Sequence, residues 1–383
     1  MASRVLGVGN IIGYVAGYSD LPRYIWWLGH TQFQILCAIA SIALGSTVIL
    51  SIGTIRERDA RLEGPPIKGK SGLLSFFKQV FKSIRRLPPQ TRKVCEVEFF
   101  AWIGFFPQLF YSSSYIGDIY VQPYLEANPN MTPEEIDALY ETATRVGTFA
   151  LLVYAITSLS TNVLLPFLIA PSYDTPSANS AKAQPTRLAR FLSYVVIPGL
   201  TLRRAWLISH LIFASCMFST LVVRSIGGAT ALIGIVGVSW ALTLWAPFAI
   251  ISAEVSKLEE LRLSRGVQDD GTTDQAGVIL GIHNMSVAAP QILATIGSSI
   301  IFKFMQKPRG VPGDHSMAVV LACGGIFTLV AAYLTSRIKD EIEVPEGMRA
   351  EEGEGGARRG LAESRRGSEA ALVSNERIGG LEY

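Results

Sequence analysis

The chain has 383 residues, of which 49% are hydrophobic and only 17% are charged, and its mean hydropathy is +0.33. A soluble domain usually carries about a quarter charged residues, so this composition argues against a soluble enzyme, a nucleic-acid-binding protein and a disordered regulator. Seven uncharged stretches each reach the roughly 18 residues that suggest a bilayer span. The sequence therefore predicts an all-α, polytopic membrane protein.

In chain order, the first short uncharged run and the seven longer ones predict about eight membrane-spanning helices. The expected spans are residues 3–20, 33–54, 97–117, 145–171, 205–223, 227–253, 276–302 and 316–336. An even number of spans places both termini on one side of the membrane. Most of the 34 Lys and Arg residues lie in the loops and tails of that side. By the positive-inside rule, both termini are expected in the cytoplasm.

The loop between the second and third spans divides the chain. We expect a helix pair over 1–54, a basic cytoplasmic linker over 55–96, a six-helix bundle over 97–340 and a disordered cytoplasmic tail over 341–383. Within the linker, Leu73, Phe77, Val80 and Ile84 share one face of a basic amphipathic helix. Such a helix is typical of an inner-membrane interface, and a calmodulin-type target is the alternative.

The loop after the third span is acidic and is expected outside the cell. It contains Asn130-Met131-Thr132, an acceptor pattern for N-glycosylation at Asn130. The same residues continue into Thr132-Pro133-Glu134-Glu135, which is also the pattern of a helix capping box. The sequence is compatible with both interpretations.

The titratable side chains do not form a reaction centre in the sequence. Four cysteines and four histidines are scattered singly, without metal-ligand spacing, so neither a metal site nor a cofactor is expected. No nucleophile, base and orienting group occur together, so the sequence predicts a protein that is not an enzyme. Glu98 and Glu254 lie near the inner ends of their spans, where a solvated helix-end charge is the simpler account.

Polar and aromatic residues inside the spans mark a candidate path, because such groups are costly in a membrane. The third span holds Trp102 and Gln108, and the sixth holds Trp240. Rings beside amide and hydroxyl groups suit carbohydrate stacking with hydrogen bonding. The alternative for the aromatic residues is a belt at the membrane interface.

The seventh span has the clearest polar face. Asn284, Gln291, Thr295 and Ser298 recur at helical spacing, with His283 to one side, and Pro290 is expected to break the helix near its middle. An amide-rich face beside a break suits a water-filled, sugar-lined cavity. Hydrogen bonding between packed helices uses the same residue types and stays the alternative.

Four segments together resemble sucrose/proton symporters of the glycoside–pentoside–hexuronide branch of the major facilitator superfamily, closest to fungal members. Residues 275–291, beginning QAGVILGIHN, resemble the eleventh helix of that family. Residues 99–107 (FFAWIGFFP) resemble the seventh, residues 239–249 the tenth and residues 9–17 the fifth. The resemblance covers about 1–340 and begins at the fifth of twelve helices. It implies an incomplete major facilitator fold, in which 1–54 is the last helix pair of the first half.

The resemblance implies proton-coupled transport of sucrose or a related α-glucoside across the plasma membrane or the vacuolar membrane. The path-lining residues are then expected to be Asn10, Trp102, Gln108, Trp240, Asn284 and Gln291. His283 is the candidate for proton coupling. The alternative function is a non-transporting membrane protein that associates with full-length transporters.

Overall fold

The computed structural model of the protein describes residues 2–55, 82–85, 87–170, 195–264 and 272–340. Within these residues all regular secondary structure is helical, which confirms the all-α prediction. The expected amphipathic helix over 73–86 lies largely outside the described residues, and the expected tail over 341–383 lies entirely outside them.

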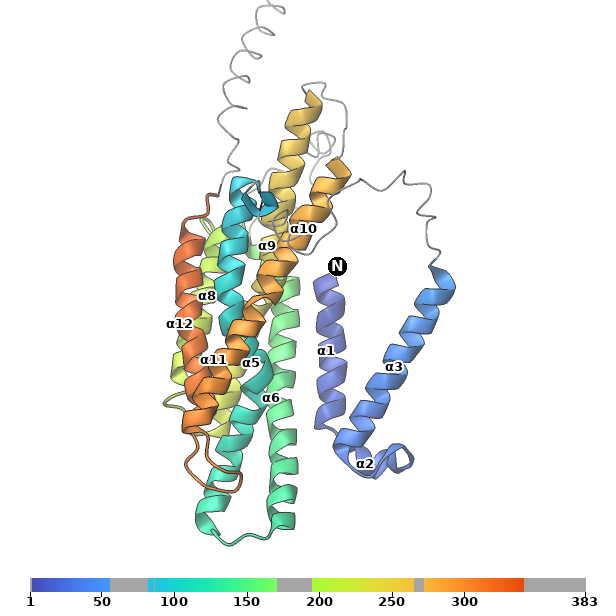
Figure 1. The fold of residues 1–383 in the computed structure, drawn as a ribbon, viewed down its shortest axis with the longest axis vertical. Helices are drawn as coiled ribbons and strands as arrows, with labels where there is room; N and C mark the ends of the chain where they lie inside the picture. The colour runs from blue at the N-terminus through green and yellow to red at the C-terminus, as the bar shows by residue number, and fades with distance from the viewer. Residues whose placement is uncertain (1, 56–81, 86, 171–194, 265–271, 341–383) are drawn as a thin grey trace, which may run out of the picture.

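The N-terminal pair consists of α1 (Ala2–Tyr18) and α3 (Gln32–Thr54), joined by the short α2 (Leu21–Tyr24) and the 3₁₀ helix η1 (Trp26–Leu28). Thr31 begins α3 with a capping box, because its hydroxyl accepts from Gln34 N–H and the Gln34 side chain accepts from Thr31 N–H. Helix α1 packs along the following bundle, whereas α3 leans away from it (Figure 1). Only 6% of the most apolar stretch of α3 is buried within the chain, as expected for a helix that faces lipid.

The C-terminal bundle follows the linker and contains the remaining long helices. They are α5 (Pro89–Ala127), α6 (Pro133–Leu168), α8 (Leu202–Ser219), α9 (Ile226–Ser264), α10 (Thr272–Ala288), α11 (Pro290–Met305) and α12 (Ser316–Ser336). The seventh expected span is α10 followed by α11, because Pro290 starts a new helix at its first turn. The predicted break is thereby confirmed.

Among the described residues, five segments are long and apolar enough to cross a membrane: α3, α6, α9, α10 with α11, and α12. Helices α1, α5 and α8 occupy the other expected spans but are shorter or more polar. Figure 1 shows the turn after α1, the α5–α6 turn and the α11–α12 loop at one end of the molecule. The starts of α5 and α10 lie toward the other end.

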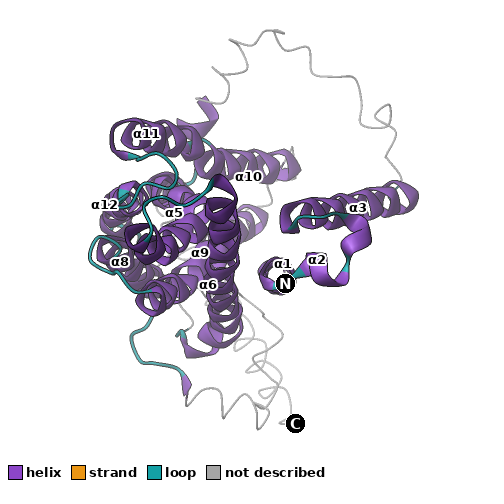
Figure 2. Cartoon of the chain, turned by 90° about the horizontal axis from the view of Figure 1, so that it is seen from below, coloured by secondary structure: helices purple, strands orange, loops and turns teal. Residues whose placement is uncertain are grey.

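Packing inside the bundle is closest where α5 crosses α12 and α6 crosses α9 (Figure 2). Gly104 of α5 lies directly against Gly324 of α12, so the two backbones touch where a side chain would separate them. Phe105 of α5 and Phe213 of α8 are fully buried beside this crossing, with ring centroids 4.3 Å apart.

Candidate functional site

Two tryptophans predicted to line a path meet in the C-terminal bundle. Trp102 of α5 and Trp240 of α9 pack edge to face, with ring centroids 5.6 Å apart. Phe105 and Tyr154 extend the same aromatic group, at 5.9 Å and 6.3 Å from the Trp240 ring. Because α5, α6 and α9 each contribute a ring, the group sits between elements that are far apart in the sequence. We call Trp102, Trp240, Phe105 and Tyr154 the aromatic platform.

Glu98 is joined to this platform, contrary to its interpretation as a solvated charge at the helix end. Its side chain is only 1% exposed, and the Trp102 indole N–H donates to its Oε2 at 2.5 Å. The other carboxyl oxygen, Oε1, has no hydrogen-bond partner among the described residues. Glu98 and Trp102 are four residues apart and therefore share a helix face. That spacing was visible in the sequence, whereas the burial was not.

Gln108 lies further along the same helix and is fully buried. Its Nε2 donates to the Ser112 hydroxyl at 3.3 Å, while its Oε1 has no partner within the described chain. Thr243 Oγ1 and the Trp245 indole nitrogen of α9 are also buried without a partner there. Buried polar atoms normally find partners, so these atoms are available to water or to another polar molecule.

His283 on α10 is 2% exposed and packs against the Phe248 ring of α9, with centroids 4.6 Å apart. Neither ring nitrogen makes a hydrogen bond of ordinary geometry within the described residues. The histidine is therefore held mainly by apolar contact, and no carboxylate pairs with it in the described chain.

The remaining predicted path residues occupy more open positions. Asn284 and Gln291 are exposed on α10 and α11, and Asn10 on α1 is half-buried. The structure thus brings Trp102 and Trp240 together and leaves these three amides on faces that are not covered. Their role in a path stays a prediction.

Glu254 is the second residue whose predicted environment was wrong. It is fully buried, and its carboxylate accepts hydrogen bonds from Gln90 N–H at 2.9 Å, Thr91 N–H at 2.6 Å and the Thr91 hydroxyl at 2.7 Å. These groups belong to the first turn of α5, where unpaired backbone donors and the helix dipole favour an anion. The inner end of α9 is therefore fastened to the start of α5.

Further contacts join the inner ends of the other helices. The Gln90 side chain donates to the Lys339 carbonyl at 3.2 Å, and Arg203 of α8 pairs with Asp340 at 2.8 Å. Gln90 and Arg203 lie in the first turns of α5 and α8, and Lys339 and Asp340 follow α12, so these contacts join the inner ends of three helices.

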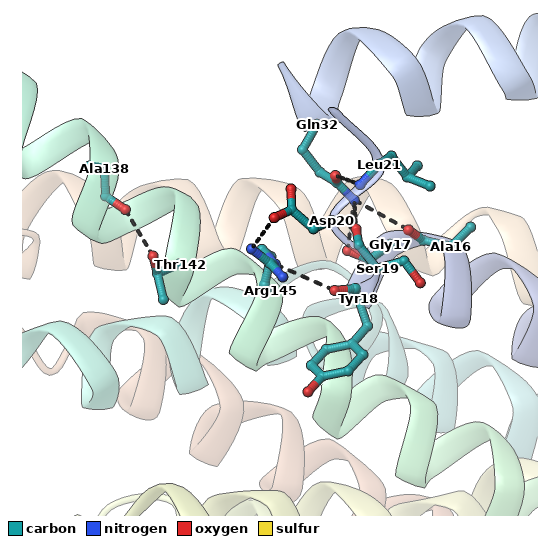
Figure 3. Close-up of polar contacts among 10 residues, drawn as sticks. All are labelled: Ala16, Gly17, Tyr18, Ser19, Asp20, Leu21, Gln32, Ala138, Thr142 and Arg145. Atoms are coloured by element: carbon teal, nitrogen blue, oxygen red, sulfur yellow. Dashed lines mark hydrogen bonds and ion pairs between the residues drawn. The ribbon is translucent and has the colours of Figure 1, made fainter. Parts of the chain in front are cut away.

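At the outer end, Arg145 of α6 joins the N-terminal pair to the bundle (Figure 3). Its guanidinium lies 3.6 Å from the Asp20 carboxylate and donates to the Tyr18 carbonyl at 3.4 Å. The Gln32 side-chain amide closes the end of α1 by donating to the carbonyls of Gly17 and Ser19, while its oxygen accepts from Leu21 N–H. One arginine and one glutamine therefore position the α1–α3 connection.

A cavity of about 360 Å³ opens at the outer end between α5, α6 and the α11–α12 loop. Asp118 and Asp314 both line it. Burial, and then the nearby Asp314 charge, raise the pKa of Asp118 to about 7. The neighbouring α5–α6 turn exposes Asn130, and Thr132 forms the expected capping box with Glu135. The capping interpretation is confirmed, and glycosylation of Asn130 stays a prediction.

Metal ligation finds no support in this geometry. Across the described ranges, no three or more His, Cys, Asp or Glu side chains are grouped so that they could hold a metal ion.

Comparison with known proteins gives the family. No family model matches the chain. An MFS-type transporter of Talaromyces islandicus is 31% identical over 207 residues, which cover 54% of this chain and 74% of that protein. The general alpha-glucoside permease of Schizosaccharomyces pombe is 32% identical over 384 residues, covering 87% of this chain and 65% of the permease. The chain belongs to the major facilitator superfamily.

A sucrose transport protein of Arabidopsis thaliana is also similar to this major facilitator chain, at 21% identity over 90% of the chain and 62% of that protein. The predicted resemblance to sucrose and α-glucoside transporters is thereby confirmed. The chain spans less than two thirds of the length of the permease and of this sucrose transporter. Since the relatives are permeases and transporters, the major facilitator chain is an integral membrane protein and not an enzyme.

Proposed function

We propose that this major facilitator chain carries out proton-coupled transport of sucrose or a related α-glucoside. The observation that carries the proposal is the aromatic platform, with Glu98, Gln108 and Thr243 buried nearby and incompletely hydrogen-bonded. The permease and the sucrose transporters among its relatives supply the substrate class.

A sugar matches both halves of this chemistry. Its apolar C–H face stacks on an indole ring, and its hydroxyls donate to and accept from neutral amides and hydroxyls. A buried oxygen without a partner costs free energy, and a sugar hydroxyl or water removes that cost when it binds. Gln108 Oε1 and Thr243 Oγ1 are acceptors of this kind.

The proposed path runs past the aromatic platform, with Gln108 toward the outside and His283 on the facing α10. Asn10, Asn284 and Gln291 complete the proposed path, and alternating access around a midplane site would move sugar along it. The proposed transported species are the sugar and protons. The proposed location is the plasma membrane, and the vacuolar membrane is the alternative. His283 remains a titratable candidate for coupling.

A second candidate function follows from the exposed amides on α10 and α11. Only 17% of the most apolar stretch of this span is buried, yet Asn284 and Gln291 lie on its surface. An amide facing lipid is costly, so the face requires a polar cavity or another protein. A non-transporting chain that associates with full-length transporters satisfies the same requirement.

Uptake of labelled sucrose and maltose into transporter-deficient cells tests the first function. Trp102→Ala and Trp240→Ala are expected to weaken the apparent affinity by about tenfold or more, because each removes a stacking surface worth roughly 1.4 kcal/mol. Trp27→Ala is the matched control, since Trp27 is 69% exposed in η1. Sugar-independent co-purification with a full-length transporter, with no uptake by the chain alone, favours the second function.

A further inference from the structure

Glu98 is a carboxyl group inside a membrane-spanning helix without a cation beside it. It is 1% exposed, and no ion pair involves it among the described residues. A carboxylate in such surroundings is costly, because neither water nor a positive charge stabilises it. The surroundings of Glu98 therefore suit a carboxyl group that binds and releases a proton.

Among the described residues, the titratable groups on α5 and on the helices packed against it form no ion pair with Glu98. Cys95 lies one turn earlier on α5, and the helices packed on α5 carry Tyr154 (α6), Glu254 (α9), His283 (α10), Lys303 (α11) and Cys323 (α12). Glu254 is occupied by the first turn of α5, and His283 packs on Phe248. Arg92 pairs with Glu96, whose side chain is 50% exposed, at 3.7 Å. Within the described chain, the only hydrogen bond to the Glu98 carboxyl is therefore that of Trp102.

That hydrogen bond links protonation to the sugar-binding surface. Oε2 accepts from the Trp102 indole, whose ring packs on Trp240, while Oε1 is buried and unpaired. An ionised carboxylate only accepts hydrogen bonds, whereas a protonated one also donates. When a proton binds to Oε1 of Glu98, this unpaired oxygen changes from a hydrogen-bond acceptor into a hydrogen-bond donor beside the aromatic platform.

We propose that Glu98 is the residue that holds the coupling proton in this transporter, and that Trp102 connects its protonation to sugar binding. The proton is taken from hydronium or water, forms one O–H bond at Oε1 and leaves to water on the opposite side. This inference rests on the proposed function. It differs from the His283 hypothesis, because Glu98 has a direct polar contact with the platform and His283 has none in the described chain.

The decisive variant is Glu98→Gln, which keeps the shape of the side chain but replaces the carboxyl group by an amide that does not titrate. Glu96→Gln is the matched control, two residues away on the same helix and exposed. In cells, Glu98→Gln is expected to lose uphill accumulation of sucrose and sugar-dependent proton uptake, whereas Glu96→Gln retains both. Thermal unfolding of each purified variant shows whether it is folded.

A measurement that does not need transport uses the full chain in liposomes. Infrared difference spectra recorded against pH are expected to contain the band of a buried protonated carboxyl, lost in Glu98→Gln and kept in Glu96→Gln. Addition of sucrose is expected to shift that band in the wild type. Trp102→Phe keeps an aromatic ring but removes the indole N–H donor. In this variant the carboxyl band of Glu98 is expected to shift, and the pH dependence of sucrose uptake is expected to change.

Outcomes separate this inference from the proposed function. If the wild type shows neither uptake nor a sugar-dependent infrared change, the proposed function fails. If the wild type accumulates sucrose and folded Glu98→Gln does so equally well, the function stands and the Glu98 inference is overturned. Loss of coupling in His283→Gln with coupling intact in Glu98→Gln likewise overturns it.

Discussion

Three donors converge on Glu254 at the inner end of α9, two of them backbone N–H groups of α5. Glu254→Gln replaces a charged acceptor by an amide that has one acceptor oxygen and two donor hydrogens. We expect a loss of about 1.5–3 kcal/mol, the range for hydrogen bonds to charged groups. The measurement is the unfolding midpoint of the purified protein in detergent.

Glu260→Gln is the control for that experiment. Glu260 lies on the same helix, and its contact with Lys257 is 3.4 Å with both side chains well exposed. Exposed pairs contribute little, so this variant should unfold close to the wild type. Equal effects of the two substitutions would show that Glu254 does not fasten α5.

Asp118 makes stability depend on pH at the outer end. Its pKa is raised from 3.8 to about 7, so between these values the folded chain binds more protons than the unfolded chain. Stability therefore falls as pH rises through this window. Asp118→Asn is expected to match the wild type near pH 4 and to be more stable than it at pH 8. The measurement is the unfolding midpoint of each protein across pH. Glu126→Gln is the control, because Glu126 is an exposed carboxyl on the same helix. If the difference in midpoint between Asp118→Asn and the wild type were the same at every pH, Asp118 would not be the source of the pH dependence.

Aromatic and amide side chains inside the spans were predicted to line a path. Of these residues the structure brings Trp102 and Trp240 together and buries Gln108. Asn10, Asn284 and Gln291, predicted in the same way, lie on more open faces. The environments of Glu98 and Glu254 could not be predicted in the same way. Both lie near span ends. The helices packed on α5 bury Glu98, and the start of α5, far away in the sequence, buries Glu254. Burial of an end residue depends on tertiary neighbours.

At the scale of elements, the α5–α12 crossing depends on two glycines. A Cβ at Gly104 would collide with the Gly324 carbonyl oxygen and the Thr328 hydroxyl. Gly104→Ala is expected to separate the helices at a cost of about 1–3 kcal/mol. Gly297→Ala on α11 is the control, because no heavy atom lies within 4 Å of its added Cβ. Comparable unfolding midpoints for the two variants would argue against a close crossing.

The start of α6 separates the two interpretations of the 130–135 segment. Thr132→Ala removes the hydroxyl that accepts from Glu135 N–H and should cost about 1 kcal/mol. It also destroys the acceptor pattern, whereas Asn130→Gln destroys only the pattern. If Asn130 carries a glycan, both variants migrate faster on gels and only Thr132→Ala unfolds earlier. Unchanged migration of both would exclude glycosylation in the expressing cell.

Helix boundaries show which element features were predictable. Pro290 removes a backbone donor wherever it occurs, so the break between α10 and α11 followed from one residue. The extension of α5 and α6 well beyond the membrane-spanning stretches did not follow from apolar runs, because their outer turns are polar and are supported by capping and ion pairs such as Arg309 with Asp137 at 2.7 Å. Hydropathy therefore predicts where the membrane-spanning segments lie, whereas polar contacts determine where the helices end.

For the whole molecule, the N-terminal pair and the C-terminal bundle meet along α1 and α6, with Arg145 and Gln32 at the outer end of the contact. The charges of the loops predict how the chain is oriented in the membrane. The resemblance of its segments predicted the family, whereas the contact between α1 and α6 required the structure. The proposed transport requires these two parts to move relative to each other around the aromatic platform.

Proton-coupled uptake of labelled sucrose by this chain in transporter-deficient cells is the most direct test of that function. We expect accumulation that increases as the external pH is lowered, is abolished by dissipating the proton gradient and is weakened by Trp102→Ala but not by Trp27→Ala. Sugar uptake that is absent, or present but indifferent to both the proton gradient and the platform, would contradict it.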